Sequence, residues 1–215
     1  MTSAAESRRP KPGRAQRTRE ALLRAGRQLF SERPVDAVAI DDIVQAADVA
    51  KGSFYNHFAD REALVRAVVA EIRASIETAI GEANAGVEDP ARRMARANSV
   101  YLRFALDDPQ RARALVRIQT GLINLQSPVN RGLVDDIRAG LASGRFAIAT
   151  LEAAALFVMG VMQAAVARTA AEPSKSAAVG LAQQMNALIL QGLGVPGAEA
   201  QAIAAQAADE LIGAG

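Results

Sequence analysis

Apolar residues recur along this chain every three to four positions, which is the spacing of helices that bury one face. In the first such segment, which starts near residue 18, Leu22, Leu29 and Phe30 share one face and Pro34 ends the helix. Three more helices are predicted before residue 90, at residues 41–47, 51–58 and 60–85. No segment shows the strict alternation of a half-buried strand, so the pattern predicts an all-α protein.

Helix-start signals divide the remainder of the chain into further helices. Asp89-Pro90 and Asp108-Pro109 each combine an N-cap aspartate with a proline at the first helical position. Asp60 and Thr150 are also expected to cap helices. The helices predicted after residue 85 are residues 90–106, 109–123, 128–144, 150–170 and 176–192, with a last helix after Pro196-Gly197.

Composition excludes several classes of protein. The chain has 215 residues, of which 50% are hydrophobic and 22% charged, so it can bury a substantial core. It contains no cysteine and one histidine, which excludes disulfides, thiolate ligands and metal centres with several histidines. The longest apolar run, residues 153–161, is too short to cross a bilayer, and no secretory signal is present. We therefore expect a cytoplasmic protein with no membrane segment, no metal and no cofactor.

Basic residues are concentrated near the N-terminus. Up to residue 66 there are twelve Lys or Arg residues against nine Asp or Glu residues, and beyond it thirteen against fourteen. Five basic residues fall within the first seventeen positions: Arg8, Arg9, Lys11, Arg14 and Arg17. Because prolines and a glycine interrupt residues 1–13, we expect a flexible basic arm there, which indicates a polyanionic partner.

The short helices predicted within the first sixty residues form a candidate helix-turn-helix. Phe54 and Phe58 lie four positions apart on the third of these helices and are expected to face the core. Lysine, tyrosine and histidine can donate hydrogen bonds to phosphates, whereas serine and asparagine can read base edges. Gly52 would let the backbone approach a DNA groove closely. The outward positions of the third helix carry these residue types: Lys51, Ser53, Tyr55, Asn56 and His57.

The segment 46–58, with the sequence AADVAKGSFYNHF, and the helix start REAL at 61–64 resemble the DNA-binding domain of TetR-family transcriptional regulators. The resemblance covers about a quarter of the chain. It implies a homodimeric repressor that binds a palindromic operator in double-stranded DNA and is released by a small hydrophobic effector. The DNA-contacting residues that it implies are Lys51, Gly52, Ser53, Tyr55, Asn56, His57, Arg61, Arg14 and Arg17.

The same resemblance implies a division of the chain into three parts. These are a flexible basic arm (1–13), a three-helix, homeodomain-like helix-turn-helix domain (14–62) and a larger C-terminal helical bundle (63–215). The bundle would bind the ligand and dimerise, and the helix predicted at 60–85 would link it to the DNA-binding domain.

Several positions depart from the family pattern. Asp48 stands where the family usually has a glycine in the turn, and aspartate tolerates a left-handed backbone at modest cost. Ala50 replaces a capping serine and offers no acceptor to the first-turn amides. Ala39 or Ile40 stands in place of a threonine that usually contacts phosphate, whereas Arg61 keeps the charge of a usual lysine. These changes bear on DNA affinity and operator sequence rather than on the fold.

The implied effector pocket lies among the fourth to eighth helices. With aromatic residues at 4% and no tryptophan, we expect an aliphatic or mixed pocket rather than a stack of rings. For each apolar candidate, a plain core position is the alternative. The candidates are Met94, Tyr101, Phe104, Ile118, Leu122, Phe157, Met159 and Met162, with Arg103, Gln119, Asn124 and Gln163 as polar groups.

Two alanine-rich segments, 150–170 and 176–192, are expected to form a four-helix dimer interface. Their small residues, such as Ala153, Gly160 and Ala164, allow helices to approach closely. The alternative is that the two helices bury each other within one chain. The apolar area for either arrangement comes from Leu156, Val161, Leu181, Met185 and Leu188.

Other chemistries fit the sequence less well. Ser53, His57 and Asp60 could suggest a hydrolase triad, but a short exposed helix offers no oxyanion hole. An enzyme housed in the bundle is disfavoured because no nucleophile–base pair or cofactor motif is visible. The remaining alternative is a helical small-molecule carrier whose N-terminal domain no longer binds DNA. Adjacent aspartates occur at residues 41–42, 107–108 and 135–136. Neighbours on a helix point in different directions, so these are not expected to form a catalytic carboxylate pair. We expect them at helix starts or on solvated faces.

Overall fold

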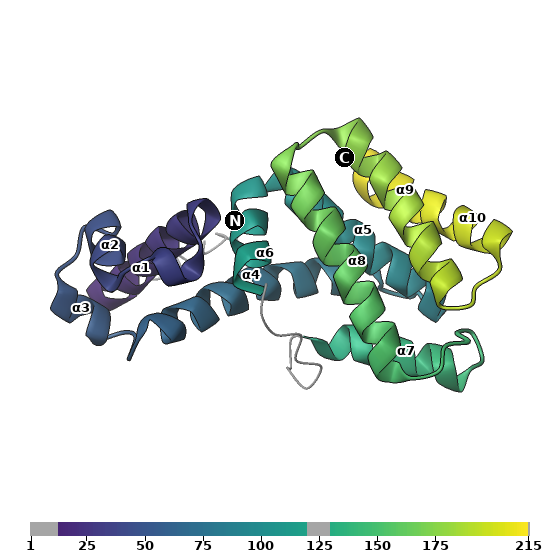
Figure 1. The fold of residues 1–215 in the computed structure, drawn as a ribbon, viewed down its shortest axis with the longest axis horizontal. Helices are drawn as coiled ribbons and strands as arrows, with labels where there is room; N and C mark the ends of the chain where they lie inside the picture. Colours follow the sequence, from purple (N-terminus) through teal and green to yellow (C-terminus); the bar gives the residue numbers. More distant parts are fainter. Residues whose placement is uncertain (1–12, 120–129, 215) are drawn as a thin grey trace, which may run out of the picture.

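The computed structural model describes residues 13–119 and 130–214, and every regular element within these ranges is helical, as the pattern predicts (Figure 1). α4 (Arg61–Ala83) leaves a small N-terminal cluster and runs into a larger bundle, so it belongs to both parts of the molecule. The proposed division between residues 62 and 63 stays a prediction. The cluster consists of α1 (Arg14–Glu32), a 3-10 turn η1 (Val35–Ala37), α2 (Ile40–Ala46) and α3 (Lys51–Tyr55).

The larger bundle places α8 and α9 side by side in front of α5, with α10 packed on α9 (Figure 1). The last helix continues into a π-helical turn, η3, that packs on α5 and α9. The described helices of the bundle are α5 (Pro90–Asp107), α6 (Pro109–Gln119), α7 (Arg131–Ala142), α8 (Leu151–Ala171), α9 (Lys175–Gly192) and α10 (Gly197–Ala208), followed by η3 (Asp209–Gly213).

Some helix boundaries differ from the prediction. α1 begins at Arg14 rather than near residue 18, because periodicity detects only the buried turns and good helix formers extend the helix before them. α3 ends at Tyr55 rather than Phe58, since the chain must turn toward the start of α4. Three predicted features lie outside the described residues: the helix start at 128, the helix end at 123 and nearly all of the basic arm.

Side chains cap four helices at the predicted positions. Each cap accepts a hydrogen bond from a backbone amide in the first turn, at donor–acceptor distances between 2.6 and 3.2 Å. A cap of this kind stabilises a helix by about 1 kcal/mol. The capping residues are Asp60, Asp89, Asp108 and Thr150.

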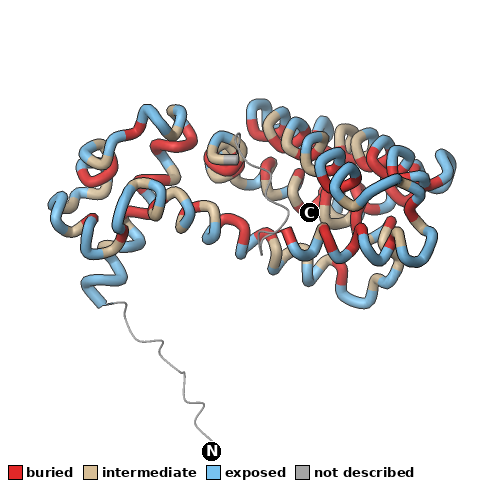
Figure 2. Tube along the Cα trace, turned by 60° about the horizontal axis from the view of Figure 1, so that its bottom comes forward, coloured by how far each residue is buried: buried red, intermediate tan, exposed pale blue. Residues whose placement is uncertain are grey.

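The described residues form two buried cores, and buried segments appear in both parts of the molecule in Figure 2. Tyr101 and Phe104 of α5 pack against both cores. The N-terminal core includes the fully buried Phe30, Phe54 and Leu64. α6 packs across α1, so Ala114 and Leu115 of the bundle belong to this core as well. The N-terminal cluster is therefore joined to the bundle by α6 as well as by α4, and the sequence predicted only the second link.

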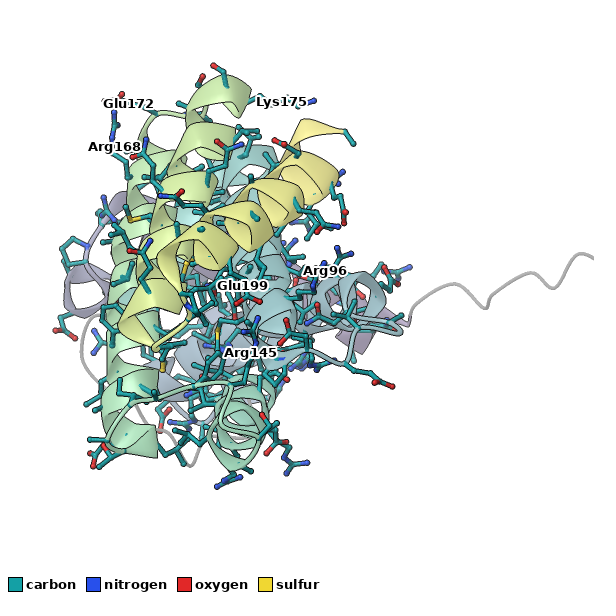
Figure 3. The ribbon with its side chains drawn as sticks, turned by 90° about the vertical axis from the view of Figure 1, so that its right-hand side faces the viewer. Arg96, Arg145, Arg168, Glu172, Lys175 and Glu199 are labelled. Atoms are coloured by element: carbon teal, nitrogen blue, oxygen red, sulfur yellow. The ribbon has the colours of Figure 1, made fainter. Side chains whose placement is uncertain are left out.

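Charged side chains fasten the C-terminal segment to α5 (Figure 3). Arg145, in the loop after α7, bridges Asp89 at 2.9 Å and Glu199 at 2.7 Å, which joins the start of α5 to the start of α10. Its hydrogen bond lowers the pKa of the Glu199 carboxyl below the ordinary value. Arg96 of α5 also pairs with Glu210 in η3.

Of the helices in the described ranges, only α8 is long and apolar enough to cross a bilayer by length and composition alone, with a mean hydropathy of 1.5. About half of its most apolar stretch (44%) is nevertheless buried inside the protein, where it packs on α5, α6 and α9. Packing of this kind is typical of a core helix in a helical bundle.

Candidate functional site

The turn between α2 and α3 places a short helix on the surface of the N-terminal cluster. Asp48 adopts the left-handed backbone predicted for it, with a φ of 53°. Ala50 is the N-cap of α3 and provides no side-chain hydrogen bond, also as predicted. Phe54 and Phe58 are 0% and 5% exposed, which confirms that they face the core. The polar side of α3 therefore faces outward.

We call the outward positions of α3 and the turn after it the recognition surface: Lys51, Gly52, Ser53, Tyr55, Asn56 and His57. Ser53 and His57 are partly exposed and the other four are exposed. Although α3 ends at Tyr55, the amides of Asn56 and His57 still donate to the carbonyls of Gly52 and Phe54. These bonds keep both side chains on the helical path. Their roles as DNA contacts stay predictions.

The charge at the head of the recognition surface is held by a neighbouring carboxylate. Lys51 Nζ lies 2.7 Å from Asp41 Oδ1 on α2, and this hydrogen bond raises the pKa of Lys51 above its ordinary value. Both side chains are more than half exposed, so water and salt screen the pair and its net stability is small. A phosphate could therefore compete with Asp41 for the lysine.

Arg61 at the start of α4 is held against η1. Its Nη1 lies 3.2 Å from the carbonyl of Asp36, and its Nη2 lies 3.0 Å from Glu62. The guanidinium thus ties α4 to the turn before α2, and its predicted contact with DNA would have to compete with these bonds. Arg14 and Arg17 lie exposed in the first turn of α1, where positive charge opposes the helix dipole. A phosphate near that helix end would offset the unfavourable interaction.

A cavity of about 550 Å³ lies in the larger bundle, between α4, α5, α6, α7 and α8. We call it the bundle cavity. Its size falls within the range of sites that bind small molecules. Much of its wall is apolar, from the side chains of Val65, Val69, Ile80, Met94, Leu115, Val116, Ile118, Leu133, Val158, Met159, Met162 and Val166.

Polar side chains gather on the part of the cavity wall formed by α4, α5 and α7. Arg73 is 6% exposed, and its Nη2 donates to Asn130 Oδ1 at 3.0 Å. Burial raises the pKa of Glu77, although the charge of Arg73 opposes this shift. Burial likewise raises the pKa of Asp136, against the Arg93 hydrogen bond of 2.6 Å. The expectation that Asp136 sits on a solvated face is wrong, because α7 turns it inward against Arg93.

The structure brings only part of the predicted pocket together. Met94, Tyr101 and Met162 line the bundle cavity, as do Ile118, Met159 and Gln163. Leu122 and Asn124 lie outside the described residues, and the side chain of Gln119 is not described either.

Two aromatic candidates lie away from the bundle cavity. Phe104 does not line the bundle cavity; the guanidinium of Arg111 covers its ring at 5.5 Å. Phe157 lies over Gly192 of α9, where a Cβ atom would come within 2.6 Å of its ring, so it faces the outside of the bundle. Arg103 is also outside the cavity, since it bonds Asp107 and the carbonyl of Leu211.

The main residues that the sequence prediction missed are polar positions on otherwise apolar helix faces. Asn98 follows Met94 by four positions and precedes Tyr101 by three, so it shares their inward face on α5. Arg73 follows Val69 of α4 by four positions, so it lies on the face of α4 that Val65 and Val69 present to the cavity. A polar residue at an apolar position of the helical period is the signal that could have identified both.

The outer faces of α8 and α9 carry an exposed apolar strip. The described residues contain four exposed large hydrophobic side chains, and three of them lie here: Leu156, Phe157 and Leu188. The fourth is Tyr55 of the recognition surface. Gly160 and Gly180 leave open space where a side chain would stand, so another helix could approach closely. No group of three or more acidic or histidine side chains within residues 13–119 and 130–214 could hold a metal ion.

Family models match most of the chain. The model described as "Bacterial regulatory proteins, tetR family" matches residues 22–68, and "Tetracyclin repressor-like, C-terminal domain" matches residues 89–206. Among curated proteins, this chain is 42% identical over 62 residues to the HTH-type transcriptional repressor DhaR of Mycobacterium sp. (strain GP1). It is 34% identical over 55 residues to the regulator UidR of Escherichia coli (strain K12). These alignments span 31% and 28% of the two relatives and 29% and 26% of this chain.

Solved structures extend the similarity to both parts of the molecule. RolR without ligand is 32% identical with a TM-score of 0.60, over 86% of this chain and 95% of RolR. RolR in complex with resorcinol is 30% identical, also with a TM-score of 0.60, over 89% and 95%. A gamma-butyrolactone receptor (ArpA-like protein) is 19% identical with a TM-score of 0.65, over 92% of this chain and 100% of the receptor, and it shares the fold alone.

Proposed function

This chain belongs to the TetR family of transcriptional regulators, and from that premise we propose that it is a dimeric repressor released from its operator by a small, largely apolar effector. The observation that carries the proposal is the position of α4. Its first residues follow the recognition surface, and Val65, Val69 and Glu77 further along line the bundle cavity. One helix therefore runs from the end of the recognition surface to the bundle cavity.

DNA would bind at the recognition surface. Lys51 and Tyr55 would hold phosphates, and Ser53 and Asn56 would read base edges in the major groove. No side chain caps α3 at Ala50, so a phosphate could accept hydrogen bonds from its first-turn amides. Arg14 and Arg17 would follow the DNA backbone from the start of α1.

Dimerisation would use the strip formed by Leu156, Phe157 and Leu188. Exposed apolar side chains gathered on one face favour a partner surface that covers them, and a second copy of the same face would do so by two-fold symmetry. Two recognition surfaces would then enter successive major grooves, roughly 34–36 Å apart, on a palindromic operator.

The effector would bind in the bundle cavity. Met94, Tyr101 and Met162 supply apolar contact there, and the volume of about 550 Å³ admits a small organic molecule. The complex of the similar protein RolR with resorcinol supports a small effector. An effector would release DNA by favouring one arrangement of α4 and α6, because these two helices join the cavity to the N-terminal core.

Operator selection from a random duplex library tests the DNA half of the proposal. We expect the selected sites to be palindromic, with half-sites about one helical turn apart, and the protein to footprint both halves as a dimer. Affinity should fall steeply with salt concentration. Ligand binding without any DNA binding would instead favour a small-molecule carrier, which the missing cap at Ala50 and the Lys51–Asp41 pair would then explain.

A further inference from the structure

Glu77 of α4 carries an accessible carboxylate on the wall of the bundle cavity. Its side chain is 39% exposed, and no group within residues 13–119 and 130–214 donates a hydrogen bond to it. Neither oxygen belongs to the fully enclosed, unpartnered polar atoms of those residues, so both keep surface that another molecule can reach. A Cβ at Gly132 would lie 3.6 Å from Oε2, so the carboxylate stands between α4 and the α7 wall.

The protein compensates this carboxylate only in part. Arg73 Nη2 lies 3.9 Å from Oε1, which is too far for a hydrogen bond, and the same atom donates to Asn130 at 3.0 Å. The other carboxylate of the cavity wall, Asp136, accepts from Arg93 at 2.6 Å. Burial raises the pKa of Glu77, because its charged form loses hydration. A hydrogen-bond donor brought by a ligand would replace that lost hydration.

The charges around the cavity favour an uncharged donor. Arg73 would repel a cation that approached Glu77, and Glu77 would repel an anion that approached Arg73. Arg93 and Asp136 form a second pair in which the charges cancel. Arg66 also borders the cavity, but its side chain is 71% exposed, so water screens its charge. A charged ligand would therefore lose its hydration without meeting an uncompensated opposite charge.

Other parts of the wall fit an apolar body. Met159, Met162 and Val166 of α8 line the cavity together with Met94 of α5. Methionine side chains are flexible and polarisable, and they pack well against aromatic rings. The cavity thus combines an accessible hydrogen-bond acceptor on α4 with apolar surface on α5 and α8.

We propose that the effector is an uncharged molecule with an apolar body and a hydroxyl group that donates a hydrogen bond to the Glu77 carboxylate. A bond from a hydroxyl to a carboxylate is charge-assisted and stronger than a bond between neutral groups. An ether or carbonyl oxygen has no hydrogen to donate to this acceptor. The inference rests on the proposed function in one respect, since it takes the bundle cavity as the effector site.

Four naphthalene compounds test the proposal: 2-naphthol, 2-methoxynaphthalene, the 2-naphthylmethylammonium cation and the 2-naphthoate anion. Their fluorescence can be titrated directly, because the chain contains no tryptophan. We expect 2-naphthol to bind roughly tenfold more tightly than 2-methoxynaphthalene, which keeps the oxygen but cannot donate, and at least as far above the two ions. Equal or tighter binding of any competitor, or binding of none of the four, would overturn the proposal.

Substitutions at Glu77 assign the preference for 2-naphthol over 2-methoxynaphthalene to this residue. Glu77→Gln keeps the size of the side chain and removes its charge, so the preference should fall to about threefold or less. Glu77→Leu removes the acceptor altogether and should abolish the preference. The affinity for 2-methoxynaphthalene should change by less than about twofold in Glu77→Gln, because that compound donates nothing to the side chain.

The matched control is Glu82→Gln. Glu82 is exposed on the same helix and does not line the cavity, so this variant should keep the parental preference. If Glu77→Leu fails to fold, the comparison with Glu77→Gln decides alone. A preference in Glu77→Gln equal to that of the parent, or one that persists in Glu77→Leu, would overturn the assignment.

The failure of this inference can be told apart from the failure of the proposed function. If 2-naphthol binds with the expected preference but never weakens operator binding, the Glu77 assignment stands and the repressor mechanism fails. If operator DNA is released equally by 2-naphthol and 2-methoxynaphthalene, the mechanism stands and the hydroxyl inference fails.

Discussion

The N-terminal cluster and the C-terminal bundle arrange their polar side chains in opposite ways. On the cluster, Lys51, Tyr55 and Asn56 project into solvent from a helix whose aromatic face is buried. In the bundle, Arg73, Asn98 and Asp136 point inward around a cavity of about 550 Å³. The cluster is thus built to meet a large, charged and hydrated partner, whereas the bundle is built to enclose a small one.

This difference has an energetic consequence. Exposed pairs such as Lys51–Asp41 are screened by water, so they can exchange one partner for another at little cost. Buried groups such as Asn98 and Asp136 are far more sensitive to what lies beside them, because the local dielectric is low. We therefore expect substitutions on the cluster to change DNA affinity by moderate factors. Substitutions in the cavity should instead change which small molecule binds.

Disrupting the exposed apolar strip on α8 and α9 should have the largest effect on DNA affinity. Leu188→Glu places a charge in the exposed apolar strip, and we expect a monomer in light scattering. Loss of the second recognition surface should lower operator affinity by about a hundredfold or more, since bivalent binding is lost. Gln201→Glu, which adds the same charge on the exposed side of α10, is the control and should remain dimeric. A Leu188→Glu dimer with parental affinity would place the interface elsewhere.

Removing one charge from the recognition surface should have a smaller, uniform effect. Lys51→Ala should weaken binding roughly tenfold on every duplex and reduce the slope of log affinity against log salt by about 0.9, as expected for one phosphate contact. Tyr55→Phe should act in the same direction. Fluorescence anisotropy at several salt concentrations measures both quantities, with Lys175→Ala at the start of α9 as the control. An unchanged slope for Lys51→Ala would remove this lysine from the interface.

Changing the base-reading positions should alter selectivity more than affinity. We expect Ser53→Ala or Asn56→Ala to shift the preferred operator sequence, with a loss of discrimination of about 1 kcal/mol at one base pair. Repeating the library selection with each variant measures this shift. Selected operators identical to those of the parent would show that both side chains face phosphate or solvent.

Releasing Lys51 from Asp41 should have the smallest effect on DNA affinity among these substitutions. Asp41→Asn frees the lysine and removes a negative charge near the DNA, so affinity should rise roughly twofold to fivefold. Asp135→Asn removes an exposed aspartate that pairs with Arg138 in the bundle, and it should leave DNA affinity unchanged. In a Lys51→Ala background most of the Asp41→Asn gain should disappear. A gain of the same size there would mean that the two residues act independently.

The sequence predicted local features of the chain better than the cavity, for a physical reason. The N-caps at Asp60, Asp89 and Thr150 and the left-handed turn at Asp48 depend on a few adjacent residues, so local chemistry identifies them. The end of α3 at Tyr55 was missed because the turn toward α4 has no comparably strong signal.

The cavity depends on side chains that five helices bring together. Met94, Tyr101 and Met162 were identified as candidates, but Phe104 and Phe157 could not be separated from them by periodicity. Whether a residue on an inward face meets core or empty space is decided by tertiary packing. Asn98 was available as a signal, since a polar residue stands at an apolar position of α5. Its unpartnered Nδ2 became apparent only in the folded structure.

The two regions are joined by shared packing. Glu71 of α4 pairs with Arg27 of α1, and Arg111 of α6 donates to Ser75 of α4 at 3.0 Å. These contacts hold α4 against α1 and α6, so a shift of α4 or α6 would change the position of the N-terminal cluster. An effector can shift this equilibrium only by its difference in affinity for the two arrangements.

Reciprocal binding measurements test the central claim most directly, namely that cavity and recognition surface are coupled. The affinity of the tightest cavity ligand from a thermal screen would be measured by calorimetry with the free protein and with the protein on its selected operator. We expect operator DNA to weaken ligand binding by the same factor, about 5- to 150-fold, by which the ligand weakens DNA binding. Equal ligand affinities for the free and the DNA-bound protein would contradict it.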